Sequence, residues 1–333
     1  MACQPDVEPD ASEQLIRLEK SISEGAVCGP FFWRRPATQS GRGAAVAATI
    51  VMALMLGACS SLRAINWLVP GDSYELDADI EYGPDPRQKL DVYRPRLAAT
   101  AQVDANGFPL VVFFHGGNWT TGERADYKFI GEALASRGIL TVVASFRKYP
   151  AVRYPDFLAD CALATAWAVR EASRYGGDSR RLVLMGHSSG AYNAAMLALD
   201  HRWLSSAGLA PSSVTGWVGL AGPYDFFPMR DPKTQPVFHH PDYPPGALPV
   251  DHVSTSSPQT FLAAAAKDDL VDPVRNSRQL ADKLRAAGVP VTLRVYDGVN
   301  HYTLIGAFGR PLRGLAPVLE DVATFVHAAP APR

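Results

Sequence analysis

The 333-residue chain has few cysteines and almost no net charge, and each shortage excludes classes of function. Its four cysteines, Cys3, Cys28, Cys59 and Cys161, do not cluster with histidines as in a zinc site, and they are too sparse for a disulfide scaffold. With 32 basic and 33 acidic residues the net charge is −1, which gives no sign of nucleic-acid binding. No glycine-rich phosphate loop appears. We therefore expect no cofactor, no metal and no nucleic-acid partner.

Long apolar runs are missing too. A membrane-spanning helix needs about 20 consecutive apolar residues, which is longer than the apolar run found here. The run at 44–56 is shorter, follows a stretch with three arginines, and ends in Leu56-Gly57-Ala58-Cys59. A basic flank, a short apolar core and small residues before a cleavage point are typical of a secretory signal, and this ending resembles a bacterial lipobox. We expect 44–58 to be a lipoprotein signal peptide and Cys59 to carry a lipid anchor. An uncleaved anchor and a chance apolar helix are the alternatives.

These signals divide the chain into segments. Residues 1–43 mix acidic residues and prolines without sustained periodicity, and we interpret them as a disordered extension or a mis-assigned start. Residues 59–75 are expected to be a linker, and 76–329 are long enough for one α/β domain with a substantial core. A lipid-anchored protein of this kind would lie in the bacterial cell envelope, at the outer membrane or the periplasmic face.

The sequence Gly-His-Ser-Ser-Gly at 186–190 carries the strongest functional signal. It follows the apolar run at 181–185 and precedes a helix-compatible run at 191–199. This order of strand, tight turn and helix is the context of a nucleophile elbow, in which glycines flank the serine because the turn leaves no room for other side chains. We predict Ser188 as the nucleophile, with an ordinary structural turn as the alternative.

A second motif, His-Gly-Gly-Asn-Trp at 115–119, follows the strand-like run at 108–114. Paired glycines let the main chain approach a substrate oxygen, and N–H groups placed there stabilise a developing oxyanion. We predict an oxyanion hole made by the N–H groups of Gly116, Gly117 and Ser189. A plain strand-to-loop turn is the alternative.

The general base is expected late in the chain, because hydrolases with this elbow follow the order serine, acid, histidine. His301 follows the strand-like run at 291–296 and is our candidate. The acid should lie on the loop at 267–273, where three aspartates compete. We favour Asp269, which fits an Asp-x-x-x-Pro frame, over Asp268. The remaining options are Asp272, which suits a helix cap better, and Asp225 on an earlier loop.

Together these motifs resemble the α/β-hydrolase superfamily, in its esterase/lipase group with a His-Gly-Gly-x-Trp motif. That group includes kynurenine formamidase-like and isoprenylcysteine methylesterase-like enzymes and bacterial carboxylesterases. The stretches at 147–150, 222–225 and 298–301 extend the resemblance, although Ala265-Ala266 replaces the usual His-Gly before the acid. The resemblance implies a mostly parallel central sheet flanked by helices. A proline-rich insertion at about 224–257 is expected to form a short cap.

The resemblance also implies a function. We expect a serine hydrolase that cleaves short acyl or aryl esters of small molecules through an acyl-enzyme. A formamide or amide hydrolase, and a non-catalytic envelope lipoprotein with this fold, are the alternatives. In the cap, apolar side chains are candidates for an acyl or aryl pocket, and His239-His240 is interpreted as a surface pair and not a metal site. The pocket candidates are Phe226, Phe227, Met229, Phe238 and Tyr243.

Overall fold

The computed structural model describes residues 65–96 and 107–330. All of them belong to one compact unit, Ala53–Arg333. The predicted extension at 1–43, the signal at 44–58 and Cys59 lie outside the described residues and stay predictions. Within the described ranges, the structure contains no helix that is long and apolar enough to cross a bilayer.

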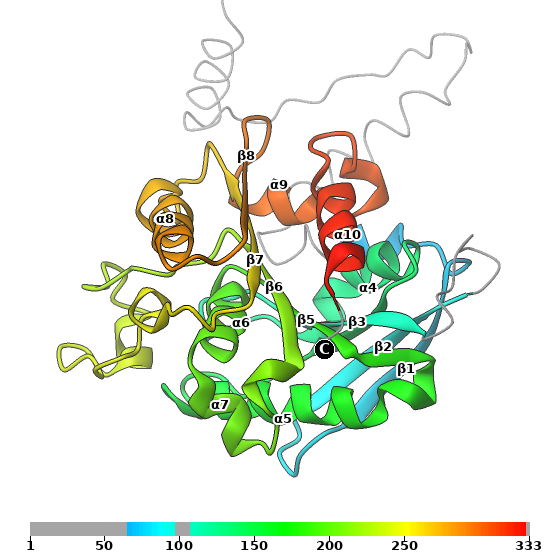
Figure 1. Ribbon diagram of the computed structural model, residues 1–333, viewed down its shortest axis with the longest axis horizontal. Coiled ribbons are helices and arrows are strands. Elements are labelled where there is room, and N and C mark those ends of the chain that lie inside the picture. The colour runs from blue at the N-terminus through cyan, green and yellow to red at the C-terminus, as the bar shows by residue number, and fades with distance from the viewer. Residues whose placement is uncertain (1–64, 97–106, 331–333) are drawn as a thin grey trace, which may run out of the picture. The chain divides into compact units, whose positions relative to one another are not determined.

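A central sheet of eight strands, in the order β1-β2-β4-β3-β5-β6-β7-β8, organises the chain (Figure 1). The two pairings that β2 makes are antiparallel, and the other five are parallel. The mostly parallel sheet expected from the sequence is thereby confirmed. The strands are β1 (Tyr74–Glu81), β2 (Lys89–Pro95), β3 (Phe108–Phe114), β4 (Leu140–Ala144), β5 (Gly177–His187), β6 (Val214–Leu220), β7 (Gln259–Ala265) and β8 (Val291–Tyr296).

Helices connect the parallel strands. They are α4 (Lys128–Ala135), α5 (Asp156–Glu171), α6 (Ser189–Leu199), α7 (His201–Ser206), α8 (Gln279–Ala286), α9 (His301–Gly306) and α10 (Val318–Ala328). A π-turn at Val274–Arg278 directly precedes α8. The predicted cap at 224–257 holds only the short 3₁₀ turns η5 (Gln235–Phe238) and η6 (Pro249–His252), as its prolines require.

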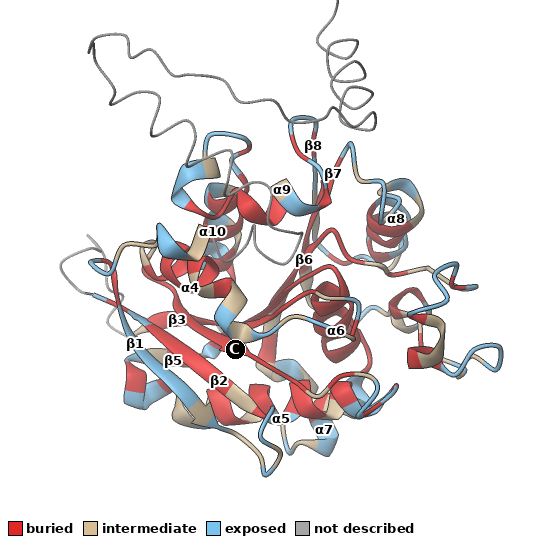
Figure 2. Ribbon diagram, turned by 180° about the vertical axis from the view of Figure 1, so that it is seen from behind, coloured by how far each residue is buried: buried red, intermediate tan, exposed pale blue. Residues whose placement is uncertain are grey.

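The central strands β3, β4, β6 and β7 are buried along nearly their whole length, because helices cover both faces of the sheet there (Figure 2). In β3, Leu110 and Val112 belong to one core cluster, and Val111 and Phe113 belong to the other. Residues of α5 to α8 complete the first cluster, and residues of α4, α9 and α10 complete the second. The sheet is therefore a rigid layer between two layers of helices.

The strand order places a topological switch point beside β3. The chain leaves β3 to form β4 on one side, and then returns to form β5 on the other side. The loops after β3 and β5 therefore run in opposite directions and leave a crevice at the carboxyl edge of the sheet, where open α/β sheets bind ligands. The two glycine motifs of the sequence occupy these two loops.

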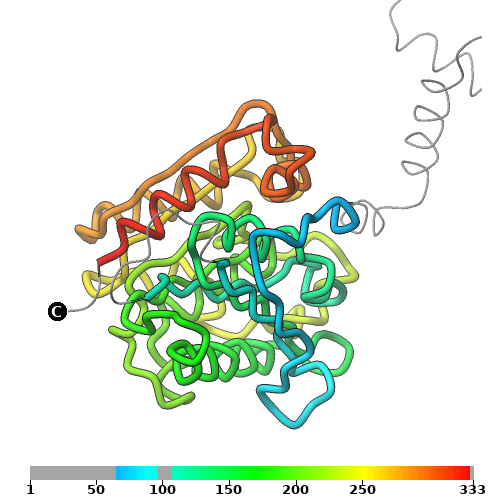
Figure 3. The backbone as a smooth tube through the Cα atoms, turned by 90° about the vertical axis from the view of Figure 1, so that its right-hand side faces the viewer, coloured from blue at the N-terminus to red at the C-terminus, as the bar shows by residue number. Residues whose placement is uncertain are grey.

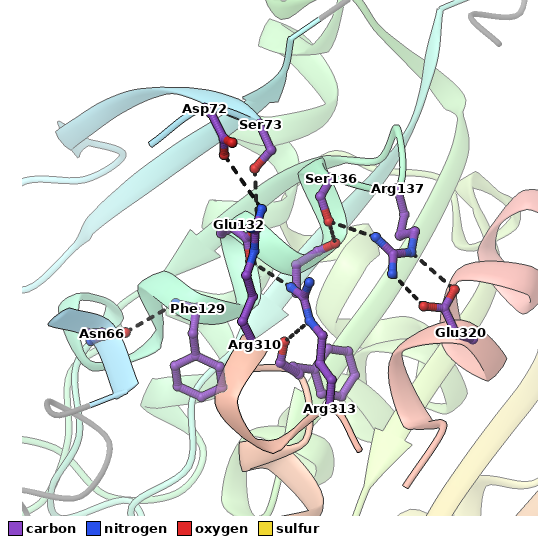
Figure 4. Close-up of polar contacts among 12 residues, drawn as sticks. Asn66, Asp72, Ser73, Phe129, Glu132, Ser136, Arg137, Arg310, Arg313 and Glu320 are labelled. Atoms are coloured by element: carbon purple, nitrogen blue, oxygen red, sulfur yellow. Dashed lines mark hydrogen bonds and ion pairs between the residues drawn. The ribbon is translucent and has the colours of Figure 1, made fainter. Parts of the chain in front are cut away.

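A buried carboxylate ties α4 to the segment that follows α9 (Figure 4). Glu132 on α4 is 1% exposed. Its Oε2 accepts a hydrogen bond from Arg313 at 2.7 Å, and its Oε1 accepts bonds from Arg310 at 3.2 Å and from Ser73 at 3.3 Å. Because a buried charge without a partner is costly, this network holds the chain after α9 against the domain.

Replacing Glu132 by glutamine is expected to lower the free energy of unfolding by about 3 kcal/mol, because two arginines lose their carboxylate. The matched control is Glu320→Gln. Glu320 binds Arg137 at 3.1 Å, but its side chain is 60% exposed. An exposed pair of this kind contributes at most about 1 kcal/mol. Urea titration of the two variants measures both effects, and equal losses would contradict the role of the buried network.

Candidate active site

Ser188 stands in the sharp turn between β5 and α6. Its backbone has φ 54° and ψ −123°, a left-handed conformation that is strained for a residue with a side chain. The flanking glycines are required by close approach: a Cβ on Gly186 would lie 2.1 Å from the Gly190 oxygen, and one on Gly190 would lie 2.1 Å from the Phe114 oxygen. The predicted turn is thus present in atomic detail, and it presents Ser188 at the start of a helix.

His301 lies at the same pocket as Ser188. His301 is the first residue of α9, whose N-cap is Asn300 in a capping box with Thr303. The sequence predicted a loop at this position and missed the helix, because a helix of six residues is too short to show an apolar periodicity.

The partner of His301 is Asp268, at 2.8 Å between Nδ1 of the imidazole and Oδ2 of the carboxylate. The side chains are 4% and 1% exposed, so this contact is screened from water. Burial raises the pKa of the Asp268 carboxyl, but hydrogen bonds and the nearby imidazole outweigh burial and hold that pKa below its ordinary value. Asp268 is therefore ionised at neutral pH and fixes the imidazole.

Our assignment of Asp269 as the acid is corrected by this geometry. Asp269 is an exposed residue of the loop, whereas Asp268 is turned inward. The second oxygen of Asp268 accepts the backbone N–H groups of Leu270 and Val271, at 3.0 and 2.9 Å. These local bonds hold the Asp268 side chain in place, and its other oxygen contacts the histidine.

The two remaining candidate acids have other partners. Asp272 accepts the N–H of Val274 at 2.8 Å at the start of the turn before α8, which is the capping role expected from the sequence. Asp225 binds Arg275 at 3.2 Å on the pocket wall.

One of the three N–H groups predicted to form an oxyanion hole has a partner within the protein. The Gly116 N–H donates to the hydroxyl of Tyr127 at 3.1 Å, so it is not available to a substrate oxygen. Gly117, with φ 127°, adopts a backbone conformation that favours glycine. Ser189 is the first residue of α6, and the first N–H of a helix has no acceptor within that helix.

Two neutral histidines lie beneath these loops. His187 donates from Nε2 to the backbone oxygen of His301 at 3.1 Å and so couples the elbow to α9. Burial, with the neighbouring His301, lowers the pKa of His187 to about 3. His115 stacks on Phe146 with ring centroids 4.5 Å apart, and burial, with nearby Lys148, lowers its pKa to about 3. Neither motif histidine is therefore a candidate base.

These low pKa values predict a loss of stability in acid. His115 and His187 stay neutral in the folded protein down to about pH 3, whereas in the unfolded chain they take up protons below about pH 6.5. The unfolded state therefore binds more protons, and the free energy of unfolding falls with pH by about 1.4 kcal/mol per pH unit for each histidine. Denaturant titrations between pH 7 and pH 4 should show a shallower fall for His187→Gln. Identical slopes for both proteins would contradict the neutral, buried state of His187.

The pocket that holds Ser188 and His301 has a volume of about 360 Å³. Asn118 and Trp119 come from the loop after β3, and the cap contributes Phe226 and Met229 to its wall. Trp119 is fixed from two sides: its indole N–H donates to Asn193 at 3.0 Å, and its ring stacks on Phe226 at 5.8 Å.

The other aromatic candidates of the cap lie behind the pocket wall. Phe238 packs edge-on against Trp119 at 4.9 Å, and Phe227 stacks on Tyr243 at 4.1 Å. His239 bonds the backbone oxygen of Tyr154 at 2.8 Å, and His240 bonds the hydroxyl of Tyr243 at 3.0 Å. A search of the described residues finds no group of histidine, cysteine and acidic side chains that could hold a metal ion.

The sequence is similar to a known family and to several curated proteins. Residues 90–284 match the BD-FAE family. The probable isoprenylcysteine α-carbonyl methylesterase ICME of rice is 27% identical over 74% of this chain and 63% of its own length. The probable carboxylic ester hydrolase LipM of Mycobacterium tuberculosis is 30% identical over 67% of this chain and 57% of its own length. The chain thus spans less than two thirds of the length of these relatives.

Solved structures support the fold. The esterase Est2 of Thermogutta terrifontis with bound butyrate aligns with a TM-score of 0.61 at 20% identity, covering 79% of this chain and 97% of that one. A truncated carbohydrate esterase from gut microbiota aligns with a TM-score of 0.62 at 18% identity, covering 78% and 97%. The family match covers more than half of the chain, and the elbow, the sheet and the helices agree with it. The chain belongs to the BD-FAE family and has the fold of the α/β-hydrolase esterases.

Proposed function

We propose that this protein is a carboxylic-ester hydrolase in which Ser188, His301 and Asp268 act as nucleophile, base and acid. The single observation that supports this most is the Asp268–His301 hydrogen bond of 2.8 Å beside the pocket that Ser188 lines. A buried carboxylate that binds one imidazole nitrogen orients the ring, so that the other nitrogen can accept and release protons.

The reaction follows from these positions. With Nδ1 of His301 donating to Asp268, its Nε2 accepts the proton of Ser188 as the hydroxyl oxygen attacks the ester carbonyl. The oxyanion that forms is stabilised by the N–H groups of Gly117 and Ser189, and each such donor contributes on the order of 3 kcal/mol. His301 then protonates the leaving alcohol. Water repeats the cycle on the acyl-enzyme and releases the acid.

The pocket supports a substrate with a short acyl or aryl group. Its volume of about 360 Å³ lies near the lower end of the range for small-molecule sites. Trp119, Phe226 and Met229 offer an apolar wall, which suits a short acyl or aryl group. Charged side chains on the same wall include Arg275, which is held by Asp225 and by the backbone oxygen of Phe227 at 2.6 Å.

A panel of substrates tests this proposal. Aryl acetates and butyrates are compared with long-chain acyl esters and with N-formyl aromatic amines, and kcat/KM is measured for each. We expect the short esters to be hydrolysed fastest. Preference for the formamides would favour the amidase alternative, and no turnover of any member by a folded protein would favour a non-catalytic envelope protein.

We also propose that the chain is tethered in the bacterial envelope by a lipid on Cys59. The support is the sequence alone: a basic flank, an apolar core and Leu-Gly-Ala-Cys. Two lipid-based signals, or one with additional contacts, are needed for stable anchoring. Mass spectrometry of the mature N-terminus, with Cys59→Ser as the control, tests this directly.

A further inference from the structure

Exposed apolar side chains gather at one edge of the sheet. Among the described residues, nine large hydrophobic side chains are exposed, and six of them lie on segments at the carboxyl edge, where the candidate active site opens. We call these six residues the apolar rim. They are Trp67, Leu68, Leu270, Val274, Tyr302 and Leu315. Single exposed apolar residues are ordinary on a protein surface, but a gathering around one opening indicates an interaction site.

Two rim residues adjoin members of the candidate triad in the sequence, and two more lie on segments close to them. Leu270, 57% exposed, follows Asp268 after β7 and lines the pocket itself. Tyr302, 55% exposed, is the neighbour of His301, and its ring packs edge-on against the imidazole at 5.5 Å. Val274 lies in the turn before α8, and the Leu315 segment runs beside the loop that leads to His301, where a Cβ on Gly298 would lie 3.2 Å from the Leu315 oxygen. Part of the rim is therefore contiguous with the segments that carry Asp268 and His301.

The other two rim residues are presented by a segment that is held firmly. Asn66 donates from its side chain to the Ala125 oxygen at 2.7 Å and accepts the Phe129 N–H at 3.1 Å, which fixes it to the start of α4. Ile65 packs towards Gly306 and Gly309, beside α9. Figure 3 shows this blue segment next to the orange and red one.

Because Ile65 and Val69 face the core, Trp67 and Leu68 are directed outward. Trp67 is 89% exposed and Leu68 is 62% exposed. A well-anchored turn that exposes an indole to this extent has an apolar surface available for a partner.

The chain that precedes this segment indicates what kind of partner the exposed residues contact. Cys59 lies six residues before Ile65. Six residues span at most about 20 Å, so a lipid on Cys59 would place a bilayer within about 20 Å of Ile65. Tryptophan and tyrosine are the side chains that favour the membrane–water interface, since each has an apolar ring with one polar group.

We propose that the apolar rim rests on a lipid bilayer, so that the mouth of the Ser188 pocket faces the membrane. The substrates would then include amphiphilic esters that reach the pocket from the lipid surface. This inference rests on the proposed ester hydrolysis and on the proposed lipid on Cys59. A lipid on one cysteine alone leaves the enzyme free to rotate, whereas contact through Trp67 fixes which face meets the membrane.

The contact is tested on the mature protein lipidated on Cys59, with vesicles of phosphatidylcholine that carry bromine in their acyl chains. Quenching of tryptophan fluorescence is compared between wild type and Trp67→Phe, and the difference reports Trp67 alone. We expect a quenched component that the variant lacks. Equal quenching in both proteins would overturn the proposal, and this readout does not depend on any catalytic activity.

A second measurement tests the consequence for substrate. In Trp67→Glu/Leu68→Glu, hydrolysis of an ester carried by the vesicles should fall about tenfold, since the contact of two large apolar side chains is lost. Hydrolysis of a dissolved aryl ester should be unchanged. The matched control is Leu163→Glu, because Leu163 on α5 is 42% exposed and lies outside the rim.

Equal vesicle rates for the double variant and the control would overturn the proposal. A dimer in gel filtration that the double variant abolishes would identify the partner as a second copy and would also overturn it. A wild type that hydrolyses neither ester but still shows Trp67 quenching would instead contradict only the proposed function.

Discussion

Ser188→Ala is expected to lower kcat for a short aryl ester by at least about 10⁴-fold, because the hydroxyl proposed to form the acyl-enzyme is removed. Steady-state hydrolysis with wild-type and variant protein measures the loss. The variant should fold normally, since alanine keeps the Cβ, removes only one oxygen and leaves the backbone conformation unchanged.

Ser189→Ala is the matched control for this variant. Ser189 is the neighbouring serine, and only its backbone N–H is assigned a role. We expect it to retain most of the wild-type rate. If Ser188→Ala were as active as Ser189→Ala, the nucleophile would have to be another group, and the elbow would be only a structural turn.

Asp268→Asn is expected to lower kcat by about 10⁴-fold, because an amide no longer holds His301 in the tautomer whose Nε2 accepts a proton. Asp269→Asn is the decisive control. It changes the adjacent aspartate, which is exposed and is not the residue that bonds the histidine at 2.8 Å. We expect nearly the wild-type rate from Asp269→Asn. A large loss in Asp269→Asn with a small one in Asp268→Asn would restore the assignment made from the sequence and contradict the geometry of the loop.

The extended parts of the fold could be predicted because both faces of the sheet are buried. β3 begins and ends where the apolar run at 108–114 does, and all seven of its residues are buried. The elbow was predictable for a different reason, since only glycine can stand where a Cβ would approach a carbonyl oxygen at 2.1 Å. In both cases a local pattern of residue types is enough to determine the structure.

The sequence did not predict the role of a residue where that role depends on three-dimensional contacts, either between distant residues or among neighbouring aspartates. The Asp-x-x-x-Pro pattern gives the spacing of residues along the loop, but it does not show which aspartate side chain points toward His301. That choice is made by the bonds from Leu270 and Val271 to Asp268. Likewise, the pairing of the Gly116 N–H with Tyr127, eleven residues away, has no signature in the His-Gly-Gly motif. Short helices such as α7 and α9 are held by tertiary packing, and their sequences are too brief to show a period.

The central claim is that Ser188 is an activated nucleophile, and covalent labelling tests it most directly. Wild type, Ser188→Ala and Asp268→Asn are treated with a fluorophosphonate and analysed by intact mass. We predict one adduct on wild type, none on Ser188→Ala and much slower labelling of Asp268→Asn. A folded wild type that takes up no label, or a Ser188→Ala variant that labels as fast as wild type, would contradict the account.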